Sequence, residues 1–489
     1  MQLVAYGAQD VYLTAQPQIT FFKVVYRRHT NFSMESIEQT FNGTADFGKK
    51  VSATVSRNGD LIGRMYVVAN VPAVTGVASS EFRWVNWLGH ALVKNVEVQI
   101  GGQRIDKQYG DWLHIWNELT QTAGHQAGYA NMVGNVPRLT QAISGSAANT
   151  PSVELFVPLQ FWFCRNPGLA LPLIALQYHE VKVEVEFRAK SECYWNQGAT
   201  VTVGSLSSTS LWIDYMYLDT DERRRFAQVS HEYLIEQLQF TGDEAVTSTS
   251  NKVKLSFNHP CKELVWVTQI DSVITSGTMS NKGGFQWFNY TDAIDQTYLS
   301  GTPSDPLGGG MGTAAAHSSN FPYSLPFTGG VNTAVGGDLI NTGVAVSLNS
   351  TDMTFYDLLG SPNHGTEITA GGWVSGASVL DGGENPTSTA KLQLNGHDRF
   401  TQRNGRYFNL VQPYQHHTNV PATGINVYSF ALKPEEHQPS GTCNFSRIDN
   451  ATLQLTLTSA TGTGKVRVYA VNYNVLRIMS GMGGLAYSN

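Results

Sequence analysis

Histidine and glutamate pairs are the first residues in the chain whose types and spacing could do chemistry. His231-Glu232 and His179-Glu180 begin like the HExxH zinc motif, in which two histidines four residues apart bind a metal from one helix face. The second ligand position holds Ile235 in one case and Val183 in the other, and the His231 stretch reads as a strand. The adjacent pair His416-His417 should point to opposite faces of a strand. We therefore predict no metal site at these residues.

Two glycine-rich segments match nucleotide-binding loops only in part. Gly462–Lys465 lacks the first glycine of a phosphate-binding loop and is followed by Val466 where Ser or Thr would bind magnesium, so a hairpin turn is predicted. Gly481–Ala486 matches GxGxxA, but only three residues follow, too few for a helix that could hold a pyrophosphate. No Ser or Cys occupies a nucleophile elbow. The sequence therefore predicts no catalytic residue and no cofactor.

Asparagine sequons and cysteines give the remaining chemical signals. Sequons occur six times, and Asn289 and Asn349 are the two best placed to carry sugar, because both lie in a long glycine-rich segment. The four cysteines lie far apart and form no CxxC pair, so neither a disulfide framework nor a zinc knuckle is predicted. This cysteine usage favours a reducing compartment and unmodified asparagines.

The composition indicates a β-rich or assembly-forming protein. Charged residues make up 14% of the 489 positions, against roughly 25% in ordinary soluble domains. Glycine occupies 47 positions, and the net charge is −6. Direct binding of nucleic acid is disfavoured, because no polycationic surface is available for a phosphate backbone. We also expect a soluble, non-secreted chain, since neither a signal pattern nor an apolar run of the roughly 18 residues that a membrane span needs is present.

Alternating apolar and polar residues dominate the chain and predict half-buried antiparallel strands. Val181–Phe187 and Leu453–Leu457 are clear examples, and Asn-Gly and Gly-Gly pairs provide tight turns between such segments. The body is therefore predicted to be all-β.

Helical patterns are few. In the segment 111–119, Asp111 could cap a helix on which Trp112, Ile115, Trp116 and Leu119 share one face. A second helix is predicted over 220–226, with its acidic residues at the positive end of the helix dipole. We interpret this second helix as a hinge between two domains.

An internal repeat divides the chain into two halves. Four landmarks recur in the same order, namely Ile37–Phe41 with Ile235–Phe240, Val98–Ile105 with Leu392–Phe400, the strand at Val181 with that at Leu453, and Leu211–Tyr217 with Val466–Tyr473. Each match alone could arise by chance, but their common order favours duplication. We therefore expect two sandwiches in tandem, since one sandwich would be too small for this length.

The second half carries an insertion within residues 271–390. This segment holds 20 glycines, ten acidic residues and one basic residue, Lys282. Such a backbone cannot be buried without unsatisfied polar groups, so we expect the segment to lie in solvent at one end of the second sandwich. Its aromatic residues favour a folded cap over a disordered loop.

Eight longer segments are the most specific patterns in the chain. They are Gln2–Leu13, Pro17–Lys23, Tyr26–Phe32, Arg57–Leu61, Gly101–Lys107, Pro167–Glu180, Gly441–Asn450 and Asn474–Tyr487. Together they resemble the major capsid proteins of nucleocytoplasmic large DNA viruses, and those of the algal-virus (phycodnavirus) branch most closely. The resemblance spans the chain except for the insertion within 271–390.

The resemblance implies a double jelly roll, which consists of two tandem eight-stranded antiparallel sandwiches. It implies an N-terminal arm over residues 1–26, a first jelly roll over 27–220 and a second over 221–489. Three copies would form a pseudo-hexameric capsomer that tiles an icosahedral shell over an inner membrane. Minor capsid and penton proteins would be partners, and assembly would occur in the host cytoplasm. We expect the arm at the capsomer base and the insertion facing outward, in contact with the host surface.

A glycan-binding protein or glycosidase is the alternative from another functional class. Jelly rolls also serve as lectins, and an aromatic loop such as Phe285–Tyr290 could stack on sugars. A glycosidase needs two carboxylates roughly 5 to 10 Å apart, which sequence alone does not test. Assembly separates the two functions, because a lectin stays a small oligomer whereas a capsid protein forms trimers that tile.

Overall fold

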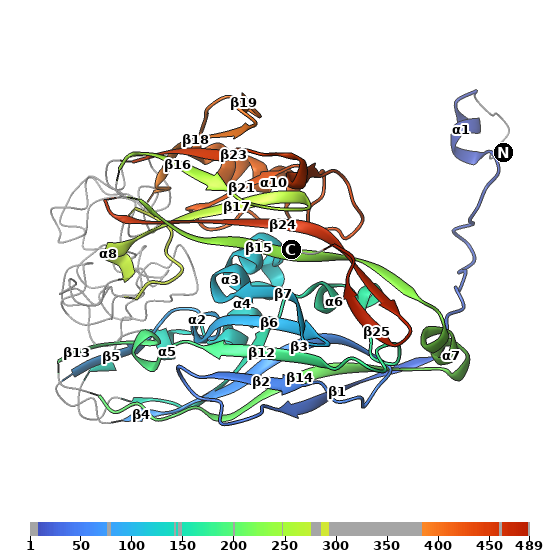
Figure 1. The fold of residues 1–489 in the computed structure, drawn as a ribbon, viewed down its shortest axis with the longest axis horizontal. Coiled ribbons are helices and arrows are strands. Elements are labelled where there is room, and N and C mark those ends of the chain that lie inside the picture. The colour runs from blue at the N-terminus through green and yellow to red at the C-terminus, as the bar shows by residue number, and fades with distance from the viewer. Residues whose placement is uncertain are drawn as a thin grey trace, which may run out of the picture.

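The chain folds into two β-sandwiches that lie one above the other in Figure 1, with the amino-terminal half below. The computed structural model describes residues 8–75, 80–140, 143–144, 149–198, 201–246, 248–274, 285–292, 384–458 and 462–487. Within these ranges the long strands run along the long axis of the molecule (Figure 1).

The first sandwich contains two antiparallel sheets. One has the strand order β1 (Phe32–Thr40), β14 (Ser207–Leu218), β3 (Leu61–Val71), β10 (Val153–Pro158), with the short β11 (Leu171–Pro172) also paired to β3. The other has the order β2 (Lys50–Thr54), β12 (Val181–Phe187), β6 (Val93–Ile100), β7 (Gln103–Tyr109).

The second sandwich repeats this plan. One sheet has the order β15 (His231–Val246), β24 (Gly464–Met479), β17 (Pro260–Ile270), β21 (Ile425–Ser429), extended by β22 (Cys443–Asn444) and β25 (Met482–Leu485). The other has the order β16 (Ser250–Leu255), β23 (Ala451–Leu457), β18 (Thr387–Leu394), β19 (His397–Asp398), extended by β20 (Arg403–Asn404).

Both sandwiches share one topology. When the eight main strands of each half are numbered along the chain, the sheet orders are 1-8-3-6 and 2-7-4-5 in both halves. This is the topology of a jelly roll, so the predicted all-β double jelly roll is confirmed. The four landmark pairs of the repeat fall on strand 1, the 4–5 hairpin, strand 7 and strand 8 of each half, which confirms the repeat.

Period-two patterns place the cores between the sheets. In β12, Val181, Val183, Val185 and Phe187 are buried while the residues between them are partly exposed. In β23 the residues from Ala451 to Leu457 alternate in the same way. The predicted hairpin at Gly462–Lys465 is wrong, because β23 and β24 belong to different sheets and the chain crosses between them there.

Short helices and strands occupy the connections. The helices are α1 (Asp10–Thr14), α2 (Leu88–Leu92), α3 (Gly110–Thr120), α4 (Ala123–Val133), α5 (Pro137–Thr140), α6 (Trp162–Arg165), α7 (Thr220–Gln228), α8 (Asp271–Ile274) and α10 (Gln412–His416), with single turns η1 (Pro167–Leu169), η2 (Lys190–Glu192), η6 (Tyr407–Val411) and η7 (Phe445–Arg447). The remaining strands are β4 (Val74–Thr75), β5 (Ser80–Trp84), β8 (Ile143–Ser144), β9 (Asn149–Thr150) and β13 (Tyr194–Gly198). The two helices predicted from sequence are confirmed as α3 and α7.

The two ends of the long axis differ. An extended segment with α1 leaves the body at the end that carries α7 and β25, whereas α8 lies at the opposite end (Figure 1). Every residue from 8 to 31 is exposed. Among the described helices, none has the length and apolar character needed to cross a membrane.

Candidate assembly interface

Helix α3 of the first sandwich packs on the outer face of the second. Figure 1 shows α3 between the two sandwiches, directly after β7. Its four apolar residues predicted to share a face, Trp112, Ile115, Trp116 and Leu119, are buried in one cluster. The rest of this junction cluster comes from the second half, namely Val265, Val267, Tyr290, Ile425, Val427, Tyr469 and Val471. The two halves therefore share a hydrophobic core.

Asp111 pairs with an arginine of the other half. The prediction that Asp111 caps α3 is wrong, because the N-cap is Tyr109 and Asp111 lies inside the first turn. The Asp111 carboxylate instead forms an ion pair with Arg467 of β24, whose Nε also lies 2.9 Å from Asp243 Oδ1. Burial would lower the pKa of Arg467, but the two carboxylates outweigh burial and raise it. Arg467 is therefore a charged bridge between the halves.

Glu236 is the centre of a second buried ion cluster. Its carboxylate lies 2.6 Å from Arg165 Nη2 of the first sandwich and 2.7 Å from Lys262 Nζ of the second, and its side chain is 4% exposed. Burial alone would raise the pKa of Glu236, but the charge of Arg165, together with contacts from His437 and Lys262, lowers it to about 2. Burial lowers the pKa of Lys262. The cluster joins the two sandwiches through opposite charges that are removed from water.

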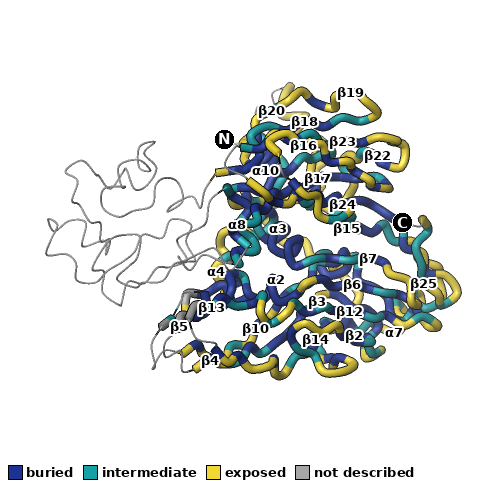
Figure 2. Tube along the Cα trace, turned by 60° about the vertical axis from the view of Figure 1, so that its left-hand side comes forward, coloured by how far each residue is buried: buried dark blue, intermediate teal, exposed yellow. Residues whose placement is uncertain are grey.

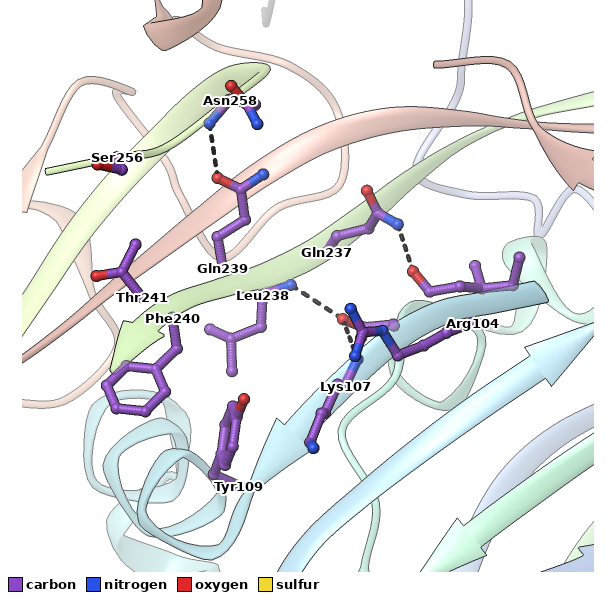
Figure 3. A pocket seen from close by; sticks show the side chains of 12 residues that line it. Arg104, Lys107, Tyr109, Gln237, Leu238, Gln239, Phe240, Thr241, Ser256 and Asn258 are labelled. Atoms are coloured by element: carbon purple, nitrogen blue, oxygen red, sulfur yellow. Dashed lines mark hydrogen bonds between the residues drawn. The ribbon is translucent and has the colours of Figure 1, made fainter. Parts of the chain in front are cut away.

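The edges of β7 and β15 face each other across a cavity of about 210 Å³ (Figure 3). Side chains bridge the two strands, since Gln237 Nε2 donates to the Ile105 carbonyl and the Leu238 amide donates to Asp106 Oδ1 at 3.1 Å. Arg104 and Lys107 also line the cavity. Burial raises the pKa of Asp106 to about 6, although its hydrogen bonds oppose this shift. The polar contacts between these two edges thus add to the apolar junction cluster.

His417 lies between two carboxylates in the second sandwich. The prediction that the His416-His417 pair lies on a strand is wrong, because His416 ends α10 and His417 follows it in an extended conformation. His417 Nε2 is 2.9 Å from Glu263 Oε2, and its Nδ1 is 2.9 Å from Glu435 Oε1. Burial would lower the pKa of His417, but the two carboxylates outweigh burial and raise it to about 9. The ring is therefore a structural cation that holds the end of α10.

The other motif histidines also have structural surroundings. His231-Glu232 begins the strand β15, as predicted. His179 Nδ1 lies 2.9 Å from the carbonyl oxygen of Gly483 in the carboxyl-terminal hairpin. Across the described ranges, no group of three His, Cys, Asp or Glu side chains is arranged to hold a metal ion.

The start of the insertion contacts the first sandwich. We expected the insertion to cap the second sandwich, but one described stretch of it, 285–292, also reaches the first. Trp287 Nε1 donates to the Glu192 carbonyl at 2.9 Å, and the Arg188 guanidinium lies 4.4 Å from the Trp287 ring centre. Tyr290 is buried in the junction cluster. This segment therefore bridges both sandwiches.

The two proposed sugar sites differ in how the structure places them. Asn289 is partly buried, its Nδ2 donates to Gln286 Oε1 at 2.6 Å, and its Oδ1 accepts from the Thr291 hydroxyl at 2.6 Å. Asn349 lies outside the described residues. Glycosylation of either asparagine stays a prediction.

Comparisons with known proteins decide the family. A family model described as large eukaryotic DNA virus major capsid protein matches residues 222–484, and one described as major capsid protein N-terminus matches residues 20–219. The major capsid protein of Phaeocystis pouchetii virus is 54% identical, over 100% of this chain and 99% of that protein. The chain belongs to the major capsid proteins of large eukaryotic DNA viruses. The resemblance seen in the sequence is therefore confirmed.

Further relatives and solved structures agree. The major capsid protein of Paramecium bursaria Chlorella virus 1 is 42% identical to this capsid protein, over 100% of this chain and 99% of that protein. The quasi-atomic model of the PBCV-1 virus capsid matches with a TM-score of 0.67 and 36% identity, over 96% of this chain and 100% of that one. The Faustovirus major capsid protein, at 13% identity and a TM-score of 0.66, shares the fold over 97% of this chain and 94% of that one.

Sequence reasoning missed the ion clusters of this capsid protein. Arg165 pairs with Glu236, which lies 71 residues further along the chain, and Arg467 pairs with Asp111 across 356 residues. No local sequence pattern indicates which partner each residue contacts. One available signal was Lys262, which with the adjacent Glu263 supplies the only charges of the segment Pro260–Ile270. A charge inside a buried strand requires a partner, so this lysine could have predicted a buried acidic residue.

Proposed function

We propose that this capsid protein forms trimers, each of which is a pseudo-hexameric capsomer of an icosahedral shell. The observation that carries the proposal is the pair of jelly rolls with one topology, fixed side by side through the junction cluster. Three such chains supply six similar lobes, which suits a lattice position with six neighbours, and threefold closure limits growth to one capsomer. The match to a protein fitted into a virus capsid supports this assembly.

The proposed orientation follows from the two unlike ends of the molecule. The arm, residues 1–26, would lie at the capsomer base, where its exposed apolar residues could contact minor capsid proteins, penton proteins or neighbouring capsomers. Phe22 is 99% exposed and Tyr12 is 91% exposed, which is unusual for an isolated surface. The acidic insertion would then face outward, towards the host surface. In support, α8, where the insertion begins, lies at the end opposite the arm (Figure 1).

The remaining expectations belong to the same proposal. The division into an arm, a first jelly roll over 27–220 and a second over 221–489 is supported by sheets whose strands do not cross that boundary. The net charge of −6 suits a shell that an inner membrane separates from the genome. Assembly in the host cytoplasm and the absence of enzymatic activity complete the proposal, in which the protein is structural.

Solution mass tests the proposal directly. We expect size exclusion coupled to light scattering to give three times 53.5 kDa at micromolar concentration, and electron microscopy of the same fraction to show hexagonal outlines. A stable monomer or dimer over that range, and particularly one retained on a glycan column, would contradict the capsomer and favour the lectin alternative.

A further inference from the structure

In the contact between the two halves of the chain, a helix packs on the outer face of a sheet. We call this helix the donor and this sheet face the acceptor. The donor, α3, lies in the connection between strands 5 and 6 of the first sandwich, β7 and β10. The acceptor is the outer face of the β15-β24-β17-β21 sheet. Across that face, Tyr469, Val265 and Val427 are register partners in one row on strands 8, 3 and 6, and all three are buried against α3.

The second sandwich carries a helical segment at the same topological position as α3. This segment consists of η6 (Tyr407–Val411) and α10, and it lies between β20 and β21, again before strand 6. Its inner side packs on its own sandwich through Phe408 and Pro413, which are buried. Its outer side exposes Leu410, Val411 and Tyr414, and Tyr414 is 80% exposed. The second sandwich thus presents a donor with an uncovered apolar side.

The first sandwich carries the matching acceptor face. Trp212, Tyr66 and Pro158 are register partners in one row on strands 8, 3 and 6 of the β1-β14-β3-β10 sheet. They point away from the core, because their chain neighbours Leu211 and Met65 are buried in it.

This row and its surroundings remain open to solvent. Trp212, Tyr66 and Pro158 are each partly exposed, and nearby Phe156 and Met34 are 38% and 53% exposed. The same row of the second sandwich is covered by α3, whereas no described element covers this one.

The donor and the acceptor lie on opposite sides of the molecule. Figures 1 and 2 both show α10 at the top and β14 at the bottom, with the within-chain contact between them. A donor on one side and an acceptor on the other suit a head-to-tail contact, which repeats from chain to chain until a ring closes. Six lobes close a ring when each step turns by about 60°, and three chains supply six lobes.

We propose that η6–α10 of one subunit packs on the outer face of the β1-β14-β3-β10 sheet of a second copy, as α3 packs on the second sandwich within one chain. This inference rests on the proposed trimer and names its contact surfaces. Tyr414 and Leu410 would fill the position of the α3 side chains, and the row of Trp212 would take the place of the row of Tyr469.

Disulfide trapping tests the contact without weakening it. Tyr414→Cys is combined in turn with Met34→Cys, Tyr66→Cys, Phe156→Cys and Trp212→Cys, and each purified protein is oxidised and run on a non-reducing gel. At least one pair should give covalent dimers and closed trimers that a reducing agent reverses. Chains with only Tyr414→Cys, co-expressed with chains that carry only the partner cysteine, should give covalent dimers and nothing larger. The four native cysteines are controlled by oxidising the unchanged protein in parallel.

A charge substitution gives the second measurement. Tyr414→Glu places a charge in the proposed contact and should raise the trimer dissociation constant at least about 100-fold, which is typical of a central interface residue. Tyr178→Glu is the matched control, because Tyr178 is a similarly exposed tyrosine, at 76%, beside β25 and away from both faces. The control should remain trimeric. Both variants should keep the circular-dichroism spectrum of the unchanged chain, since both side chains are exposed.

The outcomes separate this inference from the proposed function. If the unchanged protein is a trimer, yet no cysteine pair cross-links and Tyr414→Glu stays trimeric, the contact surfaces are wrong and the capsomer stands. If the unchanged protein is a monomer at all concentrations, the capsomer itself fails. Should Tyr414→Glu not fold, the trapping experiment alone decides.

Discussion

Charged side chains hold the two halves together at the residue scale. Glu236 forms ion pairs with Arg165 of one sandwich and Lys262 of the other, and all three are largely removed from water. Losing one partner leaves the others as buried charges without full compensation, which costs more than the pair itself contributes. Each of these three residues is therefore sensitive to truncation in a way that surface charges are not.

Truncation of Arg165 should be strongly destabilising. We expect Arg165→Ala to lower the free energy of unfolding by about 3–5 kcal/mol, because Glu236 stays buried and loses a cation. Urea denaturation followed by fluorescence measures the change. Lys433→Ala is the control, since its ion pair with Glu436 is exposed and should contribute at most about 1 kcal/mol. Equal losses for both variants would contradict the special role of the Glu236 cluster.

His417 should make stability depend on pH in the alkaline range. Its pKa of about 9 exceeds the ordinary value of 6.5, because Glu263 and Glu435 outweigh the effect of burial. The stabilisation is therefore complete below pH 6.5 and is lost as the pH rises through 9, and by linkage it amounts to about 3 kcal/mol. Urea denaturation at pH 6 and pH 9.5 measures this loss. His417→Gln should flatten it, and an unchanged pH dependence in this variant would refute the assignment.

At the element scale, the start of α3 is fixed by a close backbone approach. A Cβ on Gly110 would lie 2.2 Å from the His90 carbonyl oxygen and 2.3 Å from that of Val93. Both contacts are backbone atoms, so neither can move without shifting α2 or β6. Glycine at this position lets α3 turn from β7 towards the second sandwich.

Gly110→Ala should therefore destabilise the protein through α3. We expect a loss of at least about 2 kcal/mol, because overpacking against backbone cannot be relieved by side-chain rotation. Differential scanning calorimetry measures the shift in Tm. Gly124→Ala in α4 is the matched control, as no atom lies within 4 Å of its added Cβ, and it should be neutral or stabilising by up to about 1 kcal/mol. A Tm for Gly110→Ala as high as that of the control would contradict the argument.

Local patterns predicted the elements well and their long-range partners poorly. The four repeat landmarks fell on equivalent strands because period-two alternation reports which face of a strand is buried. The apolar face of α3 was predicted for the same reason, at the helical period. Asp111 was misassigned as a cap, because a carboxylate near a helix start looks the same whether it binds the backbone or an arginine 356 residues away. The family resemblance, rather than any pattern in the alternation, carried the function.

At the scale of the whole molecule, the arm and the body are physically separate. Residues 8–31 are all exposed and leave the body as an extended segment (Figure 1). Exposed residues contribute little to the folding of the chain that carries them. The body therefore gains little stability from residues 8–31.

Removal of residues 1–26 should leave the body intact. We expect the Tm of the truncated chain to lie within about 2 °C of the full chain, because residues 8–26, the described part of the arm, are all exposed. Scanning calorimetry measures this, and light scattering should still give the mass of the trimer. Capsomer-to-capsomer assembly should be impaired in the same sample. A large drop in Tm would show that the arm packs on the body after all.

The shared core also has a consequence for synthesis on the ribosome. Trp112 and Trp116 of α3 emerge in the first half of the chain, but their partners Tyr469 and Val471 are translated some 350 residues later, as the Asp111–Arg467 separation of 356 residues shows. At about 5–20 residues per second, the two tryptophans wait about 20–70 s for their cover. During that time each nascent chain exposes the apolar aromatic side chains of α3, and the neighbouring chains on the same polysome expose theirs. Exposed apolar surface of this kind promotes aggregation during folding, so we expect the yield of folded protein to fall when many chains are synthesised at once.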